Sequence, residues 1–181
     1  MKIIRLLLLL GLAGCARIPD GVTPVKGFDV QRYLGTWYEI ARLDHSFERG
    51  LDNVTATYSL GKDGSLRIVN RGFDSKLKRW KEAVGNAYFV AGPDVGRLKV
   101  SFFRPFYSGY NIIGIDEQNY SYVLICGNSR EYLWILARQP ELPRTAKDLL
   151  IRKAKTLGFD TSALLFVHQK NIVGHANPSD D

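Results

Sequence analysis

Few side chains in this sequence are of the types that carry out catalysis, and the most reactive candidate is a single thiol. Cys126 lies far from the N-terminal region that holds the only other cysteine. A catalytic thiol needs a nearby cation or helix terminus to lower its pKa, and the residues around Cys126 supply no such partner. Most free cysteines of this kind are small core residues. We therefore expect Cys126 to be structural.

The remaining candidates for chemistry also fail to form a site. The three histidines lie at positions 45, 168 and 175, which is not a metal-ligand spacing. Asp44 and Glu48 lie near His45 in a stretch that we expect to be a polar, solvated loop. No Gly-rich phosphate loop, nucleophile elbow or carboxylate pair is present. The sequence predicts no enzyme, no metal site and no cofactor.

The N-terminus has the features of a targeting segment. A short positive region is followed by the apolar run Leu6–Leu12, which is shorter than the about 20 residues that span a bilayer as a helix. Leu12-Ala13-Gly14-Cys15 resembles the bacterial lipobox, in which the cysteine receives a diacylglycerol and becomes the N-terminus. More than one acyl chain is needed for stable anchoring. An ordinary secretory signal with an incidental cysteine is the alternative.

Two consequences follow from the predicted lipid anchor. Ala16 stands where inner-membrane lipoproteins carry Asp, so the resemblance favours the outer membrane, with the protein facing the periplasm. An acylated Cys15 also leaves Cys126 without a disulfide partner, so the core alone must hold the fold. Residues 17–26, with two prolines and a glycine, are predicted to be a spacer.

Charge does not point to a nucleic-acid partner. The formal net charge is +7, and removal of residues 1–14 takes away Lys2 and Arg5, so the mature charge is +7 − 2 = +5. The basic residues are scattered and no RNA-type aromatic motif accompanies them. We interpret them as a solvated surface that could weakly attract anionic lipid head groups.

The sequence of the mature chain predicts an all-β domain. Aromatic residues are frequent, and short alternating runs are separated by turn signals such as Gly61-Lys62-Asp63-Gly64. Eight such runs are predicted to be strands: Trp37–Leu43, Val54–Leu60, Leu66–Phe73, Trp80–Val90, Leu98–Phe103, Tyr110–Ile115, Tyr120–Cys126 and Tyr132–Ala137. Eight antiparallel strands can close a barrel that holds one small ligand. We predict an eight-stranded up-and-down barrel.

One helix is expected after the strands. Apolar residues recur at helical spacing over Thr145–Leu157, after Pro143 and before Gly158. A one-sided amphipathic helix should pack against the outside of the barrel. Leu164–Val167 could add a short last strand. The predicted organisation is a signal peptide at 1–14, an acylated N-terminus and spacer at 15–27, the barrel and helix at 28–170, and a flexible tail at 171–181.

The first and last predicted strands carry a family signature. Gly35-Thr36-Trp37 looks like the Gly-x-Trp motif of lipocalins, and Arg138 closes the eighth strand where that family places an arginine over the tryptophan. Such a cation over an indole contributes on the order of 0.5–2 kcal/mol. Residues 116–120 match the family's middle motif more loosely. Over residues 28–168 the chain resembles bacterial outer-membrane lipocalins of the Blc type and their apolipoprotein D-like relatives.

This resemblance implies lipid binding, with fatty acids and lysophospholipids as the expected ligands and a role in envelope lipid storage or transport. The strand order of the family selects the inward face of each run. The predicted cavity residues are Val54, Ala56, Tyr58, Ala87, Phe89, Leu98, Val100, Phe102, Tyr110, Ile112, Tyr132 and Trp134. Leu136 is expected to fill the closed end. A mostly apolar cavity with a few hydroxyls suits an acyl chain with a polar head.

Other functions remain open on sequence grounds. The barrel could be filled by side chains, which would make the protein a structural or partner-binding envelope lipoprotein. Small residues at Ala56, Ala83, Gly85 and Ala87 argue for empty space instead. A few lipocalins are isomerases that use a cavity cysteine, so a Cys126-dependent isomerase is a weaker alternative. A homodimer is also possible.

Overall fold

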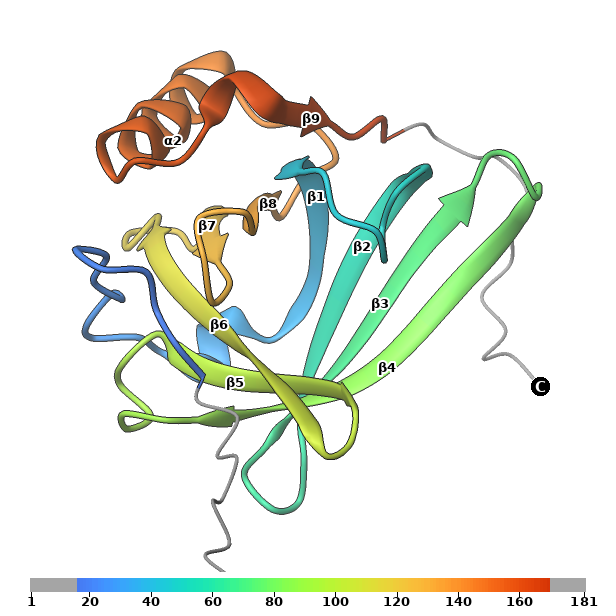
Figure 1. Cartoon of the computed structure of the whole chain (residues 1–181). Helices are drawn as coiled ribbons and strands as arrows, with labels where there is room; N and C mark the ends of the chain where they lie inside the picture. Colours follow the sequence, from blue (N-terminus) through green and yellow to red (C-terminus); the bar gives the residue numbers. More distant parts are fainter. Residues whose placement is uncertain (1–15, 170–181) are drawn as a thin grey trace, which may run out of the picture.

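The computed structural model of the chain describes residues 16–169, which form one closed β-barrel with a helix outside it (Figure 1). The sheet order is β2-β3-β4-β5-β6-β7-β8-β1-β9, and an additional β1–β2 pairing closes the barrel. The strands are β1 Gly35–Leu43, β2 Leu51–Leu60, β3 Leu66–Asp74, β4 Arg79–Phe89, β5 Arg97–Phe103, β6 Phe106–Ile115, β7 Tyr122–Cys126, β8 Leu133–Ala137 and β9 Leu164–Phe166. The predicted eight-stranded antiparallel barrel is confirmed. The predicted signal peptide, Cys15 and the predicted tail lie outside the described residues.

Local turn chemistry explains the consecutive pairing of the strands. Between β2 and β3, Asp63 accepts hydrogen bonds from the backbone and hydroxyl of Ser65, and Gly64 takes a φ of +77° that favours glycine. Between β6 and β7, the Asp116 carboxylate accepts backbone N–H groups from Gln118, Asn119 and Ser121. These turns hold each pair of strands in antiparallel register.

The loops fall into two groups at opposite ends of the barrel. The chain runs up and down, so the β1–β2, β3–β4, β5–β6 and β7–β8 loops share one end, which we call the open end. The opposite, closed end holds the β2–β3, β4–β5 and β6–β7 loops and the short helix α1 (Val30–Tyr33), which precedes β1. This division sets where a ligand could enter.

The closed end has its own core beneath α1. Trp37 is fully buried, and its indole N–H donates to the carbonyl of Tyr33 at 2.9 Å. The Arg138 guanidinium lies 3.9 Å from the Trp37 ring centroid, which confirms the predicted stacking. Arg138 also donates to the backbone carbonyls of Arg32, Leu34 and Thr36. One cation therefore holds α1 and the start of β1 against the end of β8.

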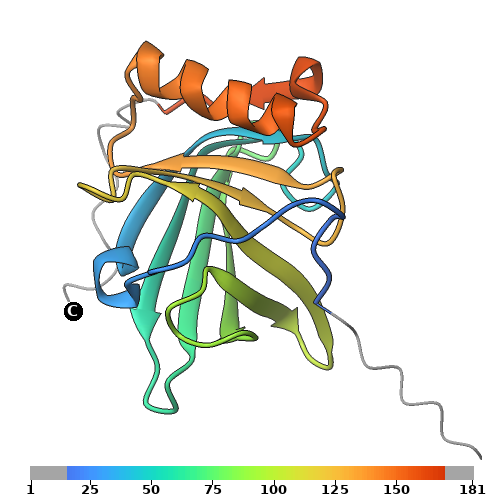
Figure 2. The ribbon, with the colours of Figure 1, turned by 90° about the vertical axis from the view of Figure 1, so that its left-hand side faces the viewer.

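A second core lies on the outer face of the barrel. Helix α2 spans Arg144–Thr156 and lies across β7 and β8 (Figure 2). Its buried residues Leu150 and Ala154 pack with Leu124 and Leu133 of the sheet. Cys126 belongs to this outer cluster and is fully buried. Within residues 16–169, no helix is long and apolar enough to cross a membrane.

The segment predicted as a spacer is packed against the barrel in residues 16–27. Val22 is buried in the outer core, and the backbone of Val25 exchanges hydrogen bonds with Ile112 and Gly96. Lys26 forms an isolated β-bridge with Val95. Figure 2 shows this segment in dark blue, crossing the barrel wall from α1 toward β6. The prolines and glycine that suggested a spacer therefore lie in a docked, extended segment.

Candidate functional site

The barrel interior contains a cavity of about 600 Å³ on the open-end side of the closed-end core. Its wall includes eight of the twelve predicted cavity residues, namely Val54, Ala56, Tyr58, Val100, Phe102, Tyr110, Tyr132 and Trp134. The small side chain of Ala83 also borders it. An interior space of this size falls within the range of small-molecule sites. The barrel is therefore hollow, which removes the premise of the filled-barrel alternative.

Four predicted cavity residues do not border this space. Ala87, Phe89, Leu98 and Ile112 face inward but pack into the closed-end core. Alternation together with the strand order of the resembled family puts them on the inner face, whereas their depth along the barrel depends on how far the closed-end core extends. Leu136, expected in that core, lies at the boundary and also borders the cavity.

Three tyrosine hydroxyls lie together at the closed-end side of the cavity, which Tyr58 and Tyr110 border. The Tyr110 hydroxyl lies 2.6 Å from that of Tyr33 and 2.7 Å from that of Tyr58. Burial raises the pKa of Tyr58 to about 12, and it raises the pKa values of Tyr33 and Tyr110 as well. The phenols are therefore neutral near pH 7 and satisfy one another's hydrogen-bonding needs. They close the apolar space with a polar but uncharged base.

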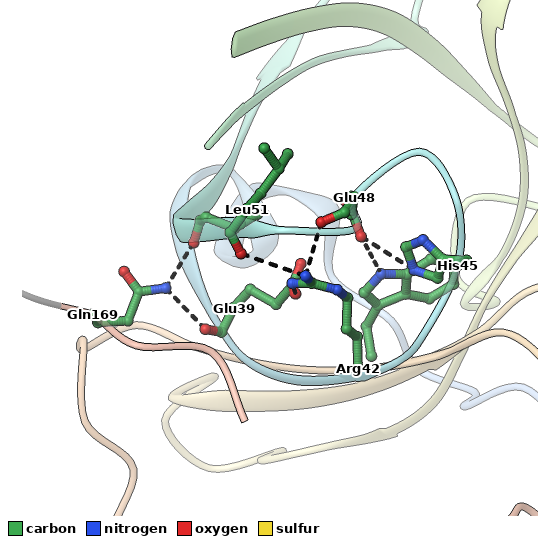
Figure 3. Close-up of polar contacts among 8 residues, drawn as sticks. Glu39, Arg42, His45, Glu48, Leu51 and Gln169 are labelled. Atoms are coloured by element: carbon green, nitrogen blue, oxygen red, sulfur yellow. Dashed lines mark hydrogen bonds and ion pairs between the residues drawn. The ribbon is translucent and has the colours of Figure 1, made fainter. Parts of the chain in front are cut away.

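A group of buried charges lies on the wall formed by β1 and the β1–β2 loop (Figure 3). Arg42 Nη1 donates to Glu39 Oε1 at 2.6 Å, and Arg42 Nη2 donates to the backbone carbonyls of Glu48 and Leu51. Glu39 and Glu48 both border the cavity, and all three charged side chains are nearly inaccessible to solvent. We call Glu39, Arg42 and Glu48 the charged cluster.

Two aromatic groups complete the surroundings of Glu48. The Trp134 indole N–H donates to Glu48 Oε2 at 3.0 Å, and His45 Nε2 lies 3.1 Å from the same oxygen. The His45 ring stacks on Phe47 at 4.0 Å between centroids. His45 and Glu48 are buried, so the prediction of a solvated loop is wrong for these two residues. The loop folds back over the cavity wall, and this long-range packing has no local sequence signal.

The electrostatics of this wall favour neutral forms. Burial and the nearby Glu48 raise the pKa of Glu39 to about 8, against the opposing effect of Arg42. Burial likewise raises the pKa of Glu48. Burial and Arg42 lower the pKa of His45 to about 4, so its imidazole is neutral near pH 7. Of these groups only Glu39 and Glu48 border the cavity, so the wall offers two buried carboxyls to the polar part of a ligand.

The far end of the described chain also contacts this wall. The Gln169 side-chain amide donates to the backbone carbonyls of Glu39 and Val54, at 2.8 and 2.9 Å (Figure 3). The His168 carbonyl accepts the backbone N–H of Asn53. These contacts hold the end of the described chain against β1 and the start of β2, close to the charged cluster.

The cavity lacks the parts of a nucleophilic site among the described residues. Cys126 lies in the outer core, on the opposite side of the barrel wall from the cavity, and burial raises the pKa of its thiol to about 12. This position removes the basis for a Cys126-dependent isomerase. No group of three His, Cys, Asp or Glu side chains in residues 16–169 could hold a metal ion. The geometry suits binding of an apolar molecule with a polar end.

Comparison with known proteins gives concordant results. Residues 28–169 match the lipocalin-like domain family. The chain is 50% identical over 159 residues to the outer membrane lipoprotein Blc of Vibrio cholerae, covering 88% of this chain and 93% of that protein. It is 33% identical over 156 residues to rat apolipoprotein D, covering 76% and 80%. Insecticyanin from the tobacco hornworm has the same fold, with a TM-score of 0.66, 18% identity and coverage of 87% and 89%.

Proposed function

Because the chain belongs to the lipocalin-like domain family, we propose that it is an outer-membrane lipoprotein that binds a single-chain lipid in its barrel. Fatty acids and lysophospholipids are the ligand classes, and storage or transport of lipid in the cell envelope is the role. The observation that carries the proposal is the apolar cavity of about 600 Å³, which has the buried carboxyls of Glu39 and Glu48 on one wall. Catalysis forms no part of this function.

The arrangement of the cavity supports a ligand with two unlike ends. Val54, Val100 and Phe102 border it with apolar surface, which favours an acyl chain. The carboxyls of Glu39 and Glu48 lie on one wall, where they could accept from an ammonium or hydroxyl group or, when protonated, donate to a phosphate or carboxylate. A polar head group placed at that wall would leave the acyl chain in the apolar space beside it.

The proposed location rests on the N-terminus and on the relatives. The lipobox-like sequence ends at Cys15, whose sulfur would carry the diacylglycerol. Proteins named outer membrane lipoprotein Blc are about half identical to this chain over most of their length. We infer that the barrel faces the periplasm, because the predicted signal peptide would deliver the chain across the inner membrane.

The proposal is tested by narrowing the cavity without disturbing the strand that borders it. Ala83 of β4 borders the cavity, whereas its neighbour Val84 points to solvent. We expect a lysophospholipid or a fatty acid to change the Trp fluorescence of the chain from Ala16 onward in a saturable way. Ala83→Phe should weaken that binding by roughly tenfold, which corresponds to about 1.4 kcal/mol.

Val84→Phe is the matched control and should leave the affinity unchanged, since it adds the same ring to the opposite face of β4. Circular dichroism of both variants verifies that the barrel is intact. The lipid with the lower dissociation constant identifies the preferred class. The proposal would be contradicted if the folded wild-type chain bound neither lipid in a saturable way. It would also be contradicted if Ala83→Phe and Val84→Phe lost lipid affinity to the same extent.

A further inference from the structure

Four large apolar side chains project from three loops at the open end. Phe103 and Phe106, at the β5–β6 hairpin, are 75% and 70% exposed and stack on each other with 6.3 Å between centroids. Phe47 of the β1–β2 loop is 62% exposed, and Leu77 of the β3–β4 loop is also exposed. We call these four residues the apolar rim. Large exposed apolar side chains gathered at one end of a domain point to an interaction surface.

Basic side chains lie next to one part of the apolar rim. Lys76 and Lys78 are exposed on either side of Leu77 in the β3–β4 loop, and Arg79 is exposed at the start of β4. The acidic residue nearest to them in sequence, Asp74, pairs with Lys81 at 2.7 Å. This loop therefore presents positive charge around an apolar tip. Basic residues beside apolar side chains are typical of surfaces that lie on anionic membranes.

The N-terminal segment brings the chain to the same end of the barrel. The backbone N–H of Arg17 donates to Asn128 Oδ1 at 3.2 Å, and the carbonyl of Arg17 accepts from Asn111 Nδ2 at 3.2 Å. Asn128 lies in the β7–β8 loop of the open end, and it also accepts the backbone N–H of Gly109 on β6. Figure 2 shows the described chain beginning on the side where β5 and β6 are joined.

Residue 16 is itself held, because Arg97 donates to its carbonyl at 3.3 Å. Cys15, the proposed lipid attachment site, is the next residue toward the N-terminus. A single residue cannot reach around the barrel, since one residue spans at most about 3.6 Å. An anchor at Cys15 would therefore hold the side of the barrel where β6 meets the β7–β8 loop of the open end close to the bilayer.

We propose that the apolar rim docks on an anionic phospholipid bilayer, so that the mouth of the cavity faces the membrane. This inference rests on the proposed lipid anchor and lipid-binding function. Three independent features favour a bilayer over a second copy of the chain: the apolar rim, its cations and the position of the anchor. Two copies joined rim to rim would bring like charges together, whereas an anionic lipid surface complements them. The docked geometry lets a lipid pass between bilayer and cavity without crossing water.

The experiment uses the chain from Ala16 onward, which contains the whole barrel and no acyl anchor. Flotation with vesicles of phosphatidylethanolamine and phosphatidylglycerol measures the docking face alone. The wild-type chain should bind these vesicles, and bind less at high salt. Phe103→Ser with Phe106→Ser should lower the partition coefficient by roughly tenfold or more.

Leu60→Ser with Leu149→Ser is the matched control, since both leucines are 49% exposed but lie away from the open end. This control should bind vesicles as the wild type does. A second measurement introduces a tryptophan either in the rim (Phe103→Trp) or away from the open end (Leu60→Trp). Vesicles that contain brominated lipids should quench the fluorescence of the added tryptophan only in Phe103→Trp. Agreement of both measurements supports the docked orientation.

Three results would overturn the inference. They are absence of wild-type flotation, an equal loss in the rim and control variants, and a homodimer that the rim substitutions abolish. Lipid titration of the wild-type chain without vesicles separates this inference from the proposed function, because Phe103 and Phe106 themselves border the cavity. Saturable lipid binding by the wild type without flotation would refute the docking alone, whereas absence of lipid binding by the wild type would refute the function on which it rests.

Discussion

At the scale of single residues, the charged cluster is the least expected feature of the molecule. Arg42, Glu39 and Glu48 are buried on the wall of an apolar cavity, where an unpaired charge would be strongly destabilising. Arg42 avoids that cost by donating to the side chain of Glu39 and to two backbone carbonyls. The cluster thus fixes the β1–β2 loop over the cavity and places the carboxyls of Glu39 and Glu48 on its wall.

The raised pKa of Glu39 predicts a pH-dependent stability. Its folded-state pKa of about 8 exceeds the ordinary value of 4.5, so the protonated form favours folding. That contribution is fully present below pH 4.5 and is lost as the pH rises through about 8. Relative to Glu39→Gln, which resembles the protonated acid, the wild type should therefore lose unfolding free energy across this window. Urea unfolding at a series of pH values measures the difference.

The exposed carboxylate of Glu117, at the closed end, provides the control. The difference between the wild type and Glu117→Gln should stay constant across the same window, because that side chain lies at the surface. A pH-independent difference between the wild type and Glu39→Gln would show that Arg42 keeps Glu39 ionised in the folded state.

At the scale of elements, the N-terminal segment is part of the barrel wall and depends on one close approach. A Cβ atom at Gly109 would lie 2.5 Å from the Arg17 carbonyl oxygen and 2.6 Å from Asn128 Oδ1. A side chain at Gly109 could therefore be accommodated only if the N-terminal segment or the β7–β8 loop moved. The absence of a side chain at Gly109 therefore allows residues 16–18 to lie against β6.

Gly109→Ala should release the N-terminal segment while leaving the barrel closed. We expect trypsin to cleave after Lys26 roughly threefold faster or more, because the local opening free energy falls. Mass spectrometry of short digests measures the cleavage rate. Ser108→Ala, on the adjacent exposed residue of β6, is the control and should digest like the wild type. Equal digestion of both variants would mean that the segment is held mainly by Val22 and Val25.

At the scale of the whole molecule, the barrel wall separates two apolar cores with different roles. The outer core joins α2, β9 and the N-terminal segment to the sheet, and it contains Cys126. The closed-end core fills one half of the interior around Trp37 and leaves the other half as the cavity. Stability and ligand binding should therefore respond to different substitutions.

Leu150→Ala tests this separation. Leu150 is buried between α2 and the sheet, so its truncation should lower the free energy of unfolding by about 2–4 kcal/mol. Lipid affinity should stay unchanged, because the cavity lies across the wall. Leu149→Ala, on the exposed neighbour, should cost under about 0.5 kcal/mol. Chemical denaturation and lipid titration measure the two effects, and a parallel loss of affinity in Leu150→Ala would refute the separation.

The amino-acid sequence by itself determined the strands, their order and the helix. Alternation along a run such as Leu98–Phe103, and turn residues such as Gly64, act over a few neighbours and can be recognised without tertiary information. The stacking of Arg138 on Trp37 could also be predicted, because the motif that contains them requires both residue types. Eight of the twelve proposed cavity residues border the cavity, and they were selected by alternation together with the strand order of the family that the chain resembles.

Only the tertiary structure decided how deep the cavity reaches and what covers it. Ala87 and Leu98 face inward as alternation requires, yet they belong to the closed-end core because side chains from α1 and β1 fill that level of the barrel. The burial of Glu48, and the docking of residues 16–27, likewise depend on partners far away in sequence, such as Trp134 and Asn128. Burial is a property of the assembled surface, and residue types in a loop carry no local signal for it.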